Sequence, residues 1–157
     1  MKIKLLVIGK TDDKNLQQLI DDYQKRLGFY SKFKMIVIPD IKNAKNLTEN
    51  QQKEKEGELI LKQLDSSDEL ILLDEKGKGF RSVEFADLLQ KKMNSGIKQL
   101  VFVVGGPYGF SDEVYKKANA KISLSKMTFS HQMIRLFMVE QLYRAFTILK
   151  NEPYHHE

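Results

Sequence analysis

The order of apolar and polar residues along the chain predicts that strands and helices alternate. Short apolar runs alternate with segments in which apolar residues recur every three or four positions, as on one face of a helix. The predicted strands cover residues 3–8, 33–38, 69–73, 99–104 and 122–124. The predicted helices cover residues 16–27, 48–64, 82–96, 111–119 and 131–150. This alternation is typical of a single α/β domain with a mostly parallel sheet of five to six strands and helices on both faces.

Polar residues with capping preferences mark the predicted helix starts. The candidates for N-caps are Thr48, Ser82, Ser111 and Ser130. Gln51 follows Thr48 by three residues, which completes the pattern of a capping box. The last helix is predicted to bury Ile134, Phe137, Met138, Gln141, Ala145 and Ile148.

The composition excludes several classes of protein. The chain has 157 residues, about the length of one domain, and its 41% hydrophobic and 30% charged residues are ordinary for a globular protein. Cysteine is absent, so disulfides, a thiolate nucleophile and cysteine-based metal sites are excluded. No apolar run is long enough to span a membrane, and the N-terminus has no signal-peptide pattern. We therefore expect a cytoplasmic protein that makes no contact with membranes.

The charge balance is compatible with a polyanionic partner but does not require one. The net charge is +5, and the lysines are scattered along the chain, as on an ordinary solvated surface. The most basic stretch covers residues 76–98, with six cations against two anions. If the partner is a nucleic acid, we expect it to contact this stretch, and charge reversal at Lys91, Lys92 and Lys98 should weaken its binding.

Glycine is concentrated where the third and fourth predicted strands end. Ligands of open parallel sheets bind beyond the carboxyl ends of the strands, and glycine lets a ligand approach the backbone there. Residues 74–79 and 105–109 are glycine-rich, and residues 122–131 add a third loop of apolar and hydroxyl side chains. These loops are also compatible with ordinary turns. Gly9 stands alone after the first strand, and no Walker motif is present, so neither a dinucleotide site nor a Walker-type site is expected.

The histidines do not predict a metal site. All three lie in the last 27 residues, and the adjacent His155 and His156 cannot both face one metal from a regular helix. His131 has no second ligand at helical spacing. We therefore expect no bound metal.

Two further features lie near the C-terminus. Glu140 and Arg144 are spaced to form an ion pair along a helix. The terminal segment 151–157 combines a proline, a tyrosine and two histidines, which suits stacking on a nucleic-acid base.

Five motifs, taken in order, resemble the RlmH family of ribosomal RNA large-subunit methyltransferases in the SPOUT superfamily. They are Leu73–Asp74, Gly105–Gly109, Leu124–His131, Glu140–Ala145 and Pro153–His155. The resemblance extends over essentially the whole chain in length and in the order of its elements. One position departs from the pattern, because His156 stands where we expect a permanently basic residue.

The resemblance implies both a fold and a reaction. The fold would be one domain over residues 1–157 whose C-terminal part, about residues 70–157, forms a deep trefoil knot. The protein would be a homodimer that uses S-adenosyl-L-methionine to methylate N3 of a pseudouridine in 23S rRNA. The target nucleotide would lie in a stem-loop at the subunit interface of the assembled 70S ribosome.

The resemblance also implies roles for individual residues. The S-adenosylmethionine pocket would be formed by Leu73, Gly105, Leu124, Ser125, Lys126, Met127, Thr128 and Phe129. The nucleotide would be approached by His131, Arg144, Tyr154 and His155, with the tail crossing onto the partner subunit as one arrangement. Arg144 would stabilise the anion that forms at N3, and either His131 or His155 would take the proton.

Two other functions stay open from the residues alone. One is a non-catalytic, dimeric ribosome- or RNA-binding factor with the same fold. The other is a flavodoxin-like binder of a nucleotide or phosphate. A Gly105→Val change is expected to weaken binding of the methyl donor, and binding of that donor would separate the enzyme from both alternatives.

Overall fold

The computed structural model describes all 157 residues, and its strands form one five-stranded parallel sheet. The strand order is β2-β1-β4-β3-β5, and every neighbouring pair is parallel. The strands are β1 (Lys2–Ile8), β2 (Lys32–Ile38), β3 (Glu69–Gly79), β4 (Gln99–Val104) and β5 (Ala120–Ser123). The inner strands are buried on both faces, which explains why they appear in the sequence as continuous apolar runs.

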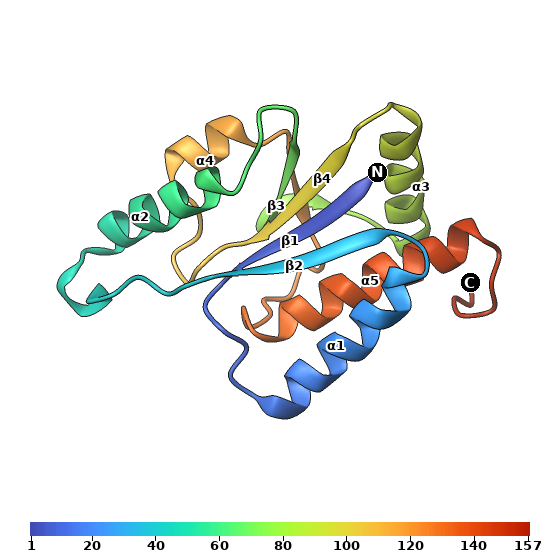
Figure 1. Cartoon of the computed structure of the whole chain (residues 1–157), viewed down its shortest axis with the longest axis horizontal. Helices are drawn as coiled ribbons and strands as arrows, with labels where there is room; N and C mark the ends of the chain where they lie inside the picture. The colour runs from blue at the N-terminus through green and yellow to red at the C-terminus, as the bar shows by residue number, and fades with distance from the viewer.

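Helices cover both faces of the sheet, as the alternating pattern predicts. The helices are α1 (Lys14–Gly28), α2 (Glu49–Lys62), α3 (Ser82–Asn94), α4 (Asp112–Lys117) and α5 (Met133–Leu149), with a short 3₁₀ helix η1 (Ala44–Asn46). In Figure 1, α1 and α5 lie together below the sheet, whereas α2 and α4 lie together above it. Helix α3 packs against α5.

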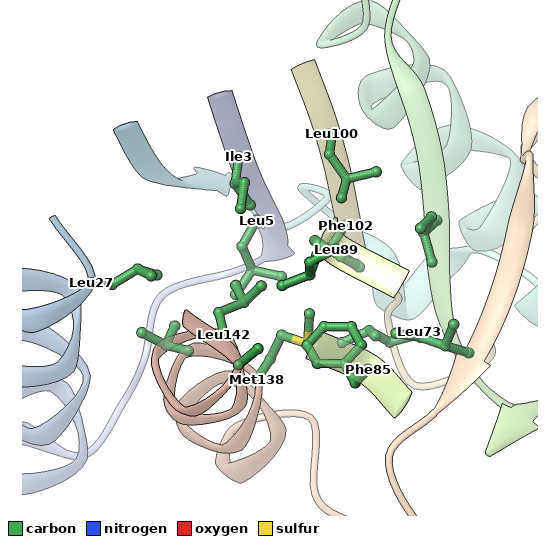
Figure 2. Packing of buried hydrophobic residues seen from close by; sticks show 14 of the residues in the cluster. Ile3, Leu5, Leu27, Leu73, Phe85, Leu89, Leu100, Phe102, Met138 and Leu142 are labelled. Carbon is green, nitrogen blue, oxygen red and sulfur yellow. The ribbon is translucent and has the colours of Figure 1, made fainter. Parts of the chain in front are cut away.

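Each face of the sheet has its own hydrophobic cluster. Ile3, Leu5 and Val7 of β1 point to the side of α1, α3 and α5 and join a cluster of 18 buried residues. Figure 2 shows Leu27, Phe85, Met138 and Leu142 from these helices packed against strand residues of that cluster. The alternate β1 residues Leu6 and Ile8 join a second cluster, of 10 residues, on the other face.

The third strand is longer than the sequence pattern predicts. We expected it to end at Leu73 and to be followed by a loop, but β3 continues to Gly79 with an irregularity after Leu73. Both Leu73 and Lys78 pair with Ile122 of β5, so the residues between them bulge around that position. A Cβ atom on Gly77 would lie 2.5 Å from the carbonyl carbon of Ile122. The glycine is therefore explained by close packing of two backbones.

Most predicted helix caps are confirmed. Thr48 and Gln51 form the capping box that starts α2, and the Ser111 hydroxyl accepts from the Val114 N–H at 3.4 Å. The Ser130 hydroxyl accepts from the Met133 N–H at 3.0 Å ahead of α5.

The prediction for Ser82 is wrong. Arg81 is the N-cap of α3, and its N–H donates to the Glu84 carboxylate at 2.7 Å. Glu84 supplies the capping bond, and the Ser82 hydroxyl is free to donate to Gln141 of α5 at 2.9 Å.

The buried face of α5 also differs from the prediction. Met138 and Ala145 are buried as expected, but Phe137 is exposed and Arg135 is only 1% exposed. Ile134, Gln141 and Ile148 are half-buried. The helix packs against both α1 and α3, and these contacts rotate its buried face relative to the apolar stripe. No helix in the structure combines the length and the apolar composition needed to cross a membrane.

Candidate active site

A cleft of about 420 Å³ lies where β3, β4 and β5 reach the carboxyl end of the sheet. Loops from three parts of the sequence line it, in the place where ligands of parallel sheets bind. Of the eight residues predicted to hold the methyl donor, seven line the cleft: Leu73, Gly105, Leu124, Ser125, Met127, Thr128 and Phe129. The eighth, Lys126, is exposed and its side chain does not line the cleft.

The glycines of the loop 105–109 are required by packing within the protein. A Cβ atom on Gly105 would lie 3.0 Å from the ring of Phe110, and one on Gly106 would lie 2.2 Å from the Glu56 carboxylate. Gly109 has a φ of +82°, which favours glycine. Packing within the protein therefore explains Gly105 and Gly106, and the backbone conformation explains Gly109, whether or not a ligand binds there.

Buried Glu56 lies directly behind this loop. It belongs to α2 and is 3% exposed, and neither carboxylate oxygen has a hydrogen-bond partner. Burial raises the pKa of Glu56 above its ordinary value, and the nearby charge of Asp40 adds to this effect. Nothing in the sequence marks this residue, since it lies in a polar segment with balanced charges.

The loop after β5 is held in shape by its own hydroxyl groups. The Ser123 hydroxyl donates to the Ser125 carbonyl at 2.7 Å, and the Met127 N–H donates to the Ser125 hydroxyl at 2.9 Å. The side chains of Met127 and Phe129 stay exposed, and the Phe129 ring lies 5.0 Å from that of Phe137 on α5. The loop therefore presents an apolar surface next to the cleft.

One wall of the cleft is acidic. Asp74 and Glu75 line it, and neither forms an ion pair with a lysine or arginine. The Tyr115 hydroxyl donates to Asp74 at 2.5 Å. Burial, with the bond to Asp74, raises the pKa of Tyr115 to about 12. Leu73 of this stretch was predicted to line the site, but no role was predicted for the two carboxylates beside it.

His131 lines the cleft at the start of α5, and Arg135 fixes the backbone around it. The Arg135 Nε donates to the His131 carbonyl at 3.0 Å. Its Nη1 and Nη2 donate to the carbonyls of Gly9 and Ile8 at 2.8 and 2.7 Å. Nη1 also donates to the Thr11 hydroxyl at 3.1 Å. One buried guanidinium therefore ties the end of β1 to the start of α5.

The other three predicted catalytic residues meet around Glu140. Arg144 donates to the Glu140 carboxylate from Nε at 3.1 Å and from Nη2 at 2.6 Å, which confirms the predicted ion pair. The Tyr154 hydroxyl donates to the same carboxylate oxygen at 2.9 Å and lies 3.1 Å from the hydroxyl of Tyr23. The Arg144 guanidinium lies 4.7 Å from the centre of the Tyr154 ring. His155 completes the cluster.

The contacts of this cluster determine its charge states. Burial alone lowers the pKa of Arg144, but the bonds to Glu140 outweigh it and the net shift is upward. Arg144 Nη1 lies 3.2 Å from His155 Nδ1. Because a guanidinium only donates, Nδ1 accepts, and neutral His155 carries its proton on Nε2. Burial, Tyr23 and Glu140 together raise the pKa of Tyr154.

A single chain does not bring the four predicted catalytic residues together. His131 lies at the cleft, whereas Arg144, Tyr154 and His155 do not line it. Arg144 is eleven residues along α5 from Met133, about 16 Å along the helix axis. The C-terminal tail folds onto its own helices, through Tyr154 and through bonds of Glu152 to Tyr30 and of Glu157 to Arg81. Elsewhere, no group of three or more histidine, aspartate or glutamate side chains is placed to hold a metal ion.

Comparisons with known proteins agree on one family. A family model described as a predicted SPOUT methyltransferase matches residues 1–155. The ribosomal RNA large subunit methyltransferase H of Flavobacterium psychrophilum is 74% identical over 157 residues, the full length of both chains. Proteins of the same name from Flavobacterium johnsoniae and Parabacteroides distasonis are 71% and 67% identical, again over the full length of both chains.

Proposed function

The chain belongs to the SPOUT methyltransferase family and is a ribosomal RNA large-subunit methyltransferase, and from this premise we propose its reaction: transfer of a methyl group from S-adenosyl-L-methionine to N3 of a pseudouridine in 23S rRNA. The observation that carries the proposal is the cleft at the carboxyl end of the sheet, lined by seven of the residues expected to hold the donor. We further propose that the substrate is the assembled 70S ribosome, which would place the enzyme in the cytoplasm.

The cleft has the size and lining that the methyl donor requires. Its volume of about 420 Å³ lies within the range of small-molecule sites, about 300–1,000 Å³. Leu73, Leu124 and Phe129 would supply apolar surface for the adenine and the methionyl carbon chain. Asp74 and Glu75 form no ion pair within the protein, and their negative charge is suited to a ligand that carries positive charge. Lys126 would take part only through its backbone, because its side chain lies outside the cleft.

For the proposed methyl transfer the protein has to align the donor with the nucleotide and remove the proton from N3. When bound, S-adenosylmethionine supplies an electrophilic methyl group on a sulfonium centre. The N3–H of pseudouridine lies between two carbonyls, and the positive charge of Arg144 would stabilise the anion that its loss leaves. His131 is the better placed proton acceptor, because it lines the cleft and the Nδ1 lone pair of His155 is already bonded to Arg144.

We propose that a homodimer completes the site. In one chain Arg144, Tyr154 and His155 lie at the far end of α5 from the cleft, so the site is incomplete without a second copy. Met127, Phe129, Met133 and Phe137 form an exposed apolar patch beside the cleft. Burial of such a patch favours association. A two-fold symmetric dimer that buries this patch would bring Arg144 of the partner subunit to each cleft.

The family also implies a trefoil knot, which we propose for about residues 70–157.

The reaction is tested by transfer of labelled methyl from S-adenosylmethionine. Purified 70S ribosomes from cells that lack the enzyme should accept the label in their 23S rRNA, and deproteinised 23S rRNA should accept far less. Mass spectrometry of nuclease fragments should place the methyl on N3 of a pseudouridine. Label on another base or in protein would refute the proposed reaction, and absence of any donor binding by calorimetry would favour a non-catalytic RNA-binding protein.

A mixing experiment tests the shared site. His131→Ala and Arg144→Ala should each be inactive as pure proteins. Refolding or co-expressing them together forms mixed dimers in which one of the two sites is intact, so about a quarter of wild-type activity should return. If the mixture stays inactive while both variants remain dimeric, each chain must build its site alone and the proposed sharing is wrong.

A further inference from the structure

Four lysines occupy adjacent positions on the first two strands. In the parallel register of β1 and β2, Lys2 lies beside Lys32 and Lys4 lies beside Lys34. We call these four residues the lysine quartet. Neighbouring strands are about 4.8 Å apart and alternate residues along a strand about 6.6 Å apart, so the four Cα atoms form a small rectangle.

All four side chains point to the same face of the sheet. Residues alternate between faces along a strand, and Leu6 and Ile8 of β1 belong to the cluster on the α2 and α4 face. Ile38 of β2 belongs to the same cluster, and Ile36 packs against it. The quartet continues these two rows toward the start of each strand.

The helices of that face do not cover the quartet. In Figure 1, α2 and α4 lie over the end of the sheet where β1 and β2 finish, away from the N-terminus. Lys2, Lys32 and Lys34 are exposed and Lys4 is half-buried. Beside them lies an open hollow of about 820 Å³, to whose lining Lys2, Lys32 and Lys98 contribute.

The charges of the quartet are not neutralised by the protein. None of the four forms an ion pair. Asp65 and Asp68 also line the hollow, but neither forms an ion pair with a lysine. Like charges on neighbouring strands destabilise a sheet. The quartet therefore costs stability, and a function would explain why four lysines occupy these positions.

Protection of the sheet edge explains only half of the quartet. Lysines on an edge strand prevent pairing with other chains, and β2 is an edge strand. Lys2 and Lys4, however, lie on β1, which has β2 on one side and β4 on the other. An inner strand has no edge to protect, so the Lys2 and Lys4 pair needs another explanation.

The basic stretch singled out in the sequence is less compact than the quartet. Within residues 76–98, Lys92 is bonded to Glu69 and Arg81 to Glu157. Its other four cations are spread over β3, α3 and the residue before β4. The four lysines of the quartet, in contrast, occupy adjacent positions on one face of the sheet.

We propose that the lysine quartet is a second RNA-binding site, which holds the phosphodiester backbone of the ribosomal substrate away from the cleft. The inference rests on the proposed function, since it takes its ligand from the ribosome. Lysine ammonium groups bind phosphates as point charges and do not require one orientation. The quartet lies at the start of β1 and the cleft at the opposite end of the sheet, so about 20 Å of strand separates them. A large structured RNA contacts both sites, whereas a short stem-loop reaches only the cleft.

The test compares binding to ribosomes over a series of monovalent salt concentrations. The variants are Lys2→Gln/Lys4→Gln, Lys32→Gln/Lys34→Gln and the combined fourfold change. Lys45→Gln/Lys55→Gln is the matched control, because it removes the same charge from exposed positions in a segment of balanced charge. Each lost phosphate contact should lower the salt slope by about 0.7 and the affinity about fourfold at 0.15 M salt. The double variants should lose about fifteenfold and the fourfold variant more than a hundredfold.

The outcomes separate this inference from the proposed function. Donor binding by calorimetry should be unchanged in every variant, which controls for folding. The inference would be overturned if the fourfold variant had the same salt slope as the wild type, or if the control lost as much ribosome affinity as the double variants. Neither result would refute the proposed reaction, which the methyl-transfer assay tests separately. If affinity falls for ribosomes but not for deproteinised 23S rRNA, the partner is an acidic protein and the inference is wrong. Failure of the wild-type chain to bind either particle would also overturn it.

Discussion

Replacing Arg135 with methionine should destabilise the protein strongly, although the residue carries no predicted catalytic role. The side chain is 1% exposed and donates four hydrogen bonds, three of them to the carbonyls of Ile8, Gly9 and His131. No carboxylate is among its hydrogen-bond partners, so the carbonyl dipoles at the end of β1 and the start of α5 stabilise the charge, together with the nearby charges of Asp12 and Asp40. Burial accordingly lowers the pKa of Arg135.

The magnitude follows from what the substitution leaves behind. Methionine fills most of the space of the arginine stem, so the main cost is three carbonyls without partners in a dry interior. A buried acceptor left without a partner costs about 1–3 kcal/mol, and because the variant no longer has to bury a charge we expect a net loss of about 3–5 kcal/mol. For a protein of this length each kcal/mol lowers the melting temperature by about 2–4 °C, so we expect a decrease of roughly 6–20 °C. Arg135→Lys should lose less, because an ammonium group can still reach some of the carbonyls.

Urea denaturation of the wild type, the two variants and Arg26→Met measures the effect. Arg26 is exposed and stacks over Tyr23, so its replacement removes the same charge at a cost below about 1 kcal/mol. A loss below about 1 kcal/mol in Arg135→Met would refute the reasoning, because it would mean that the carbonyls find other partners. Arg135→Lys should also retain weakened methyl transfer, because the His131 carbonyl loses part of its support.

Three further predictions concern the loop, the buried acid and the apolar patch. Gly105→Val should push the Phe110 ring into the cleft and lower donor affinity at least tenfold, as measured by calorimetry. Gly79→Ala should leave donor affinity unchanged, because nothing lies within 4 Å of its added Cβ atom. The pKa of Glu56 is about 4.5 in the unfolded state and higher in the folded state, so the folded state binds this proton more tightly. Glu56 therefore lowers the stability of the folded state as the pH rises above 4.5. Glu56→Gln should therefore gain stability over the wild type in denaturation at pH 8 but not at pH 4, and an equal gain at both would contradict this. Phe137→Glu should convert a dimer to a monomer by light scattering, and an unchanged mass would remove the patch from the proposed interface.

The fold class was accessible from the sequence because its signals are local. Strand β4 was predicted with its observed bounds, since a strand buried on both faces appears as an unbroken apolar run. Thr48 and Gln51 located the start of α2, because a capping box satisfies backbone groups within one turn. The extension of β3 to Gly79 was missed, because its residues are polar and pair with β5 only through tertiary contact.

In the candidate site, too, the features set by local sequence were predicted and those set by long-range contacts were not. The three loops that line the cleft could be chosen from strand ends and glycine positions, and the family resemblance assigned the same loops. Asp74 lies in one of these loops, but nothing in the sequence marks its carboxylate, or that of Glu56, as part of the site. Both depend on which helix or loop packs nearby, and that is set by contacts between residues distant in the sequence.

Short stretches of the chain were enough to predict the alternation of strands and helices, most of the capped helix ends and the loops at one end of a parallel sheet. The periodicity of apolar residues and the capping of backbone groups act over only a few residues. Contacts between distant residues establish that Arg135 is buried and Phe137 is exposed, that Arg144 and His131 lie at opposite ends of α5, and that four lysines adjoin on one face. These facts follow from how α1 and α3 rotate α5 and how β1 pairs with β2, and no short stretch of sequence contains that information.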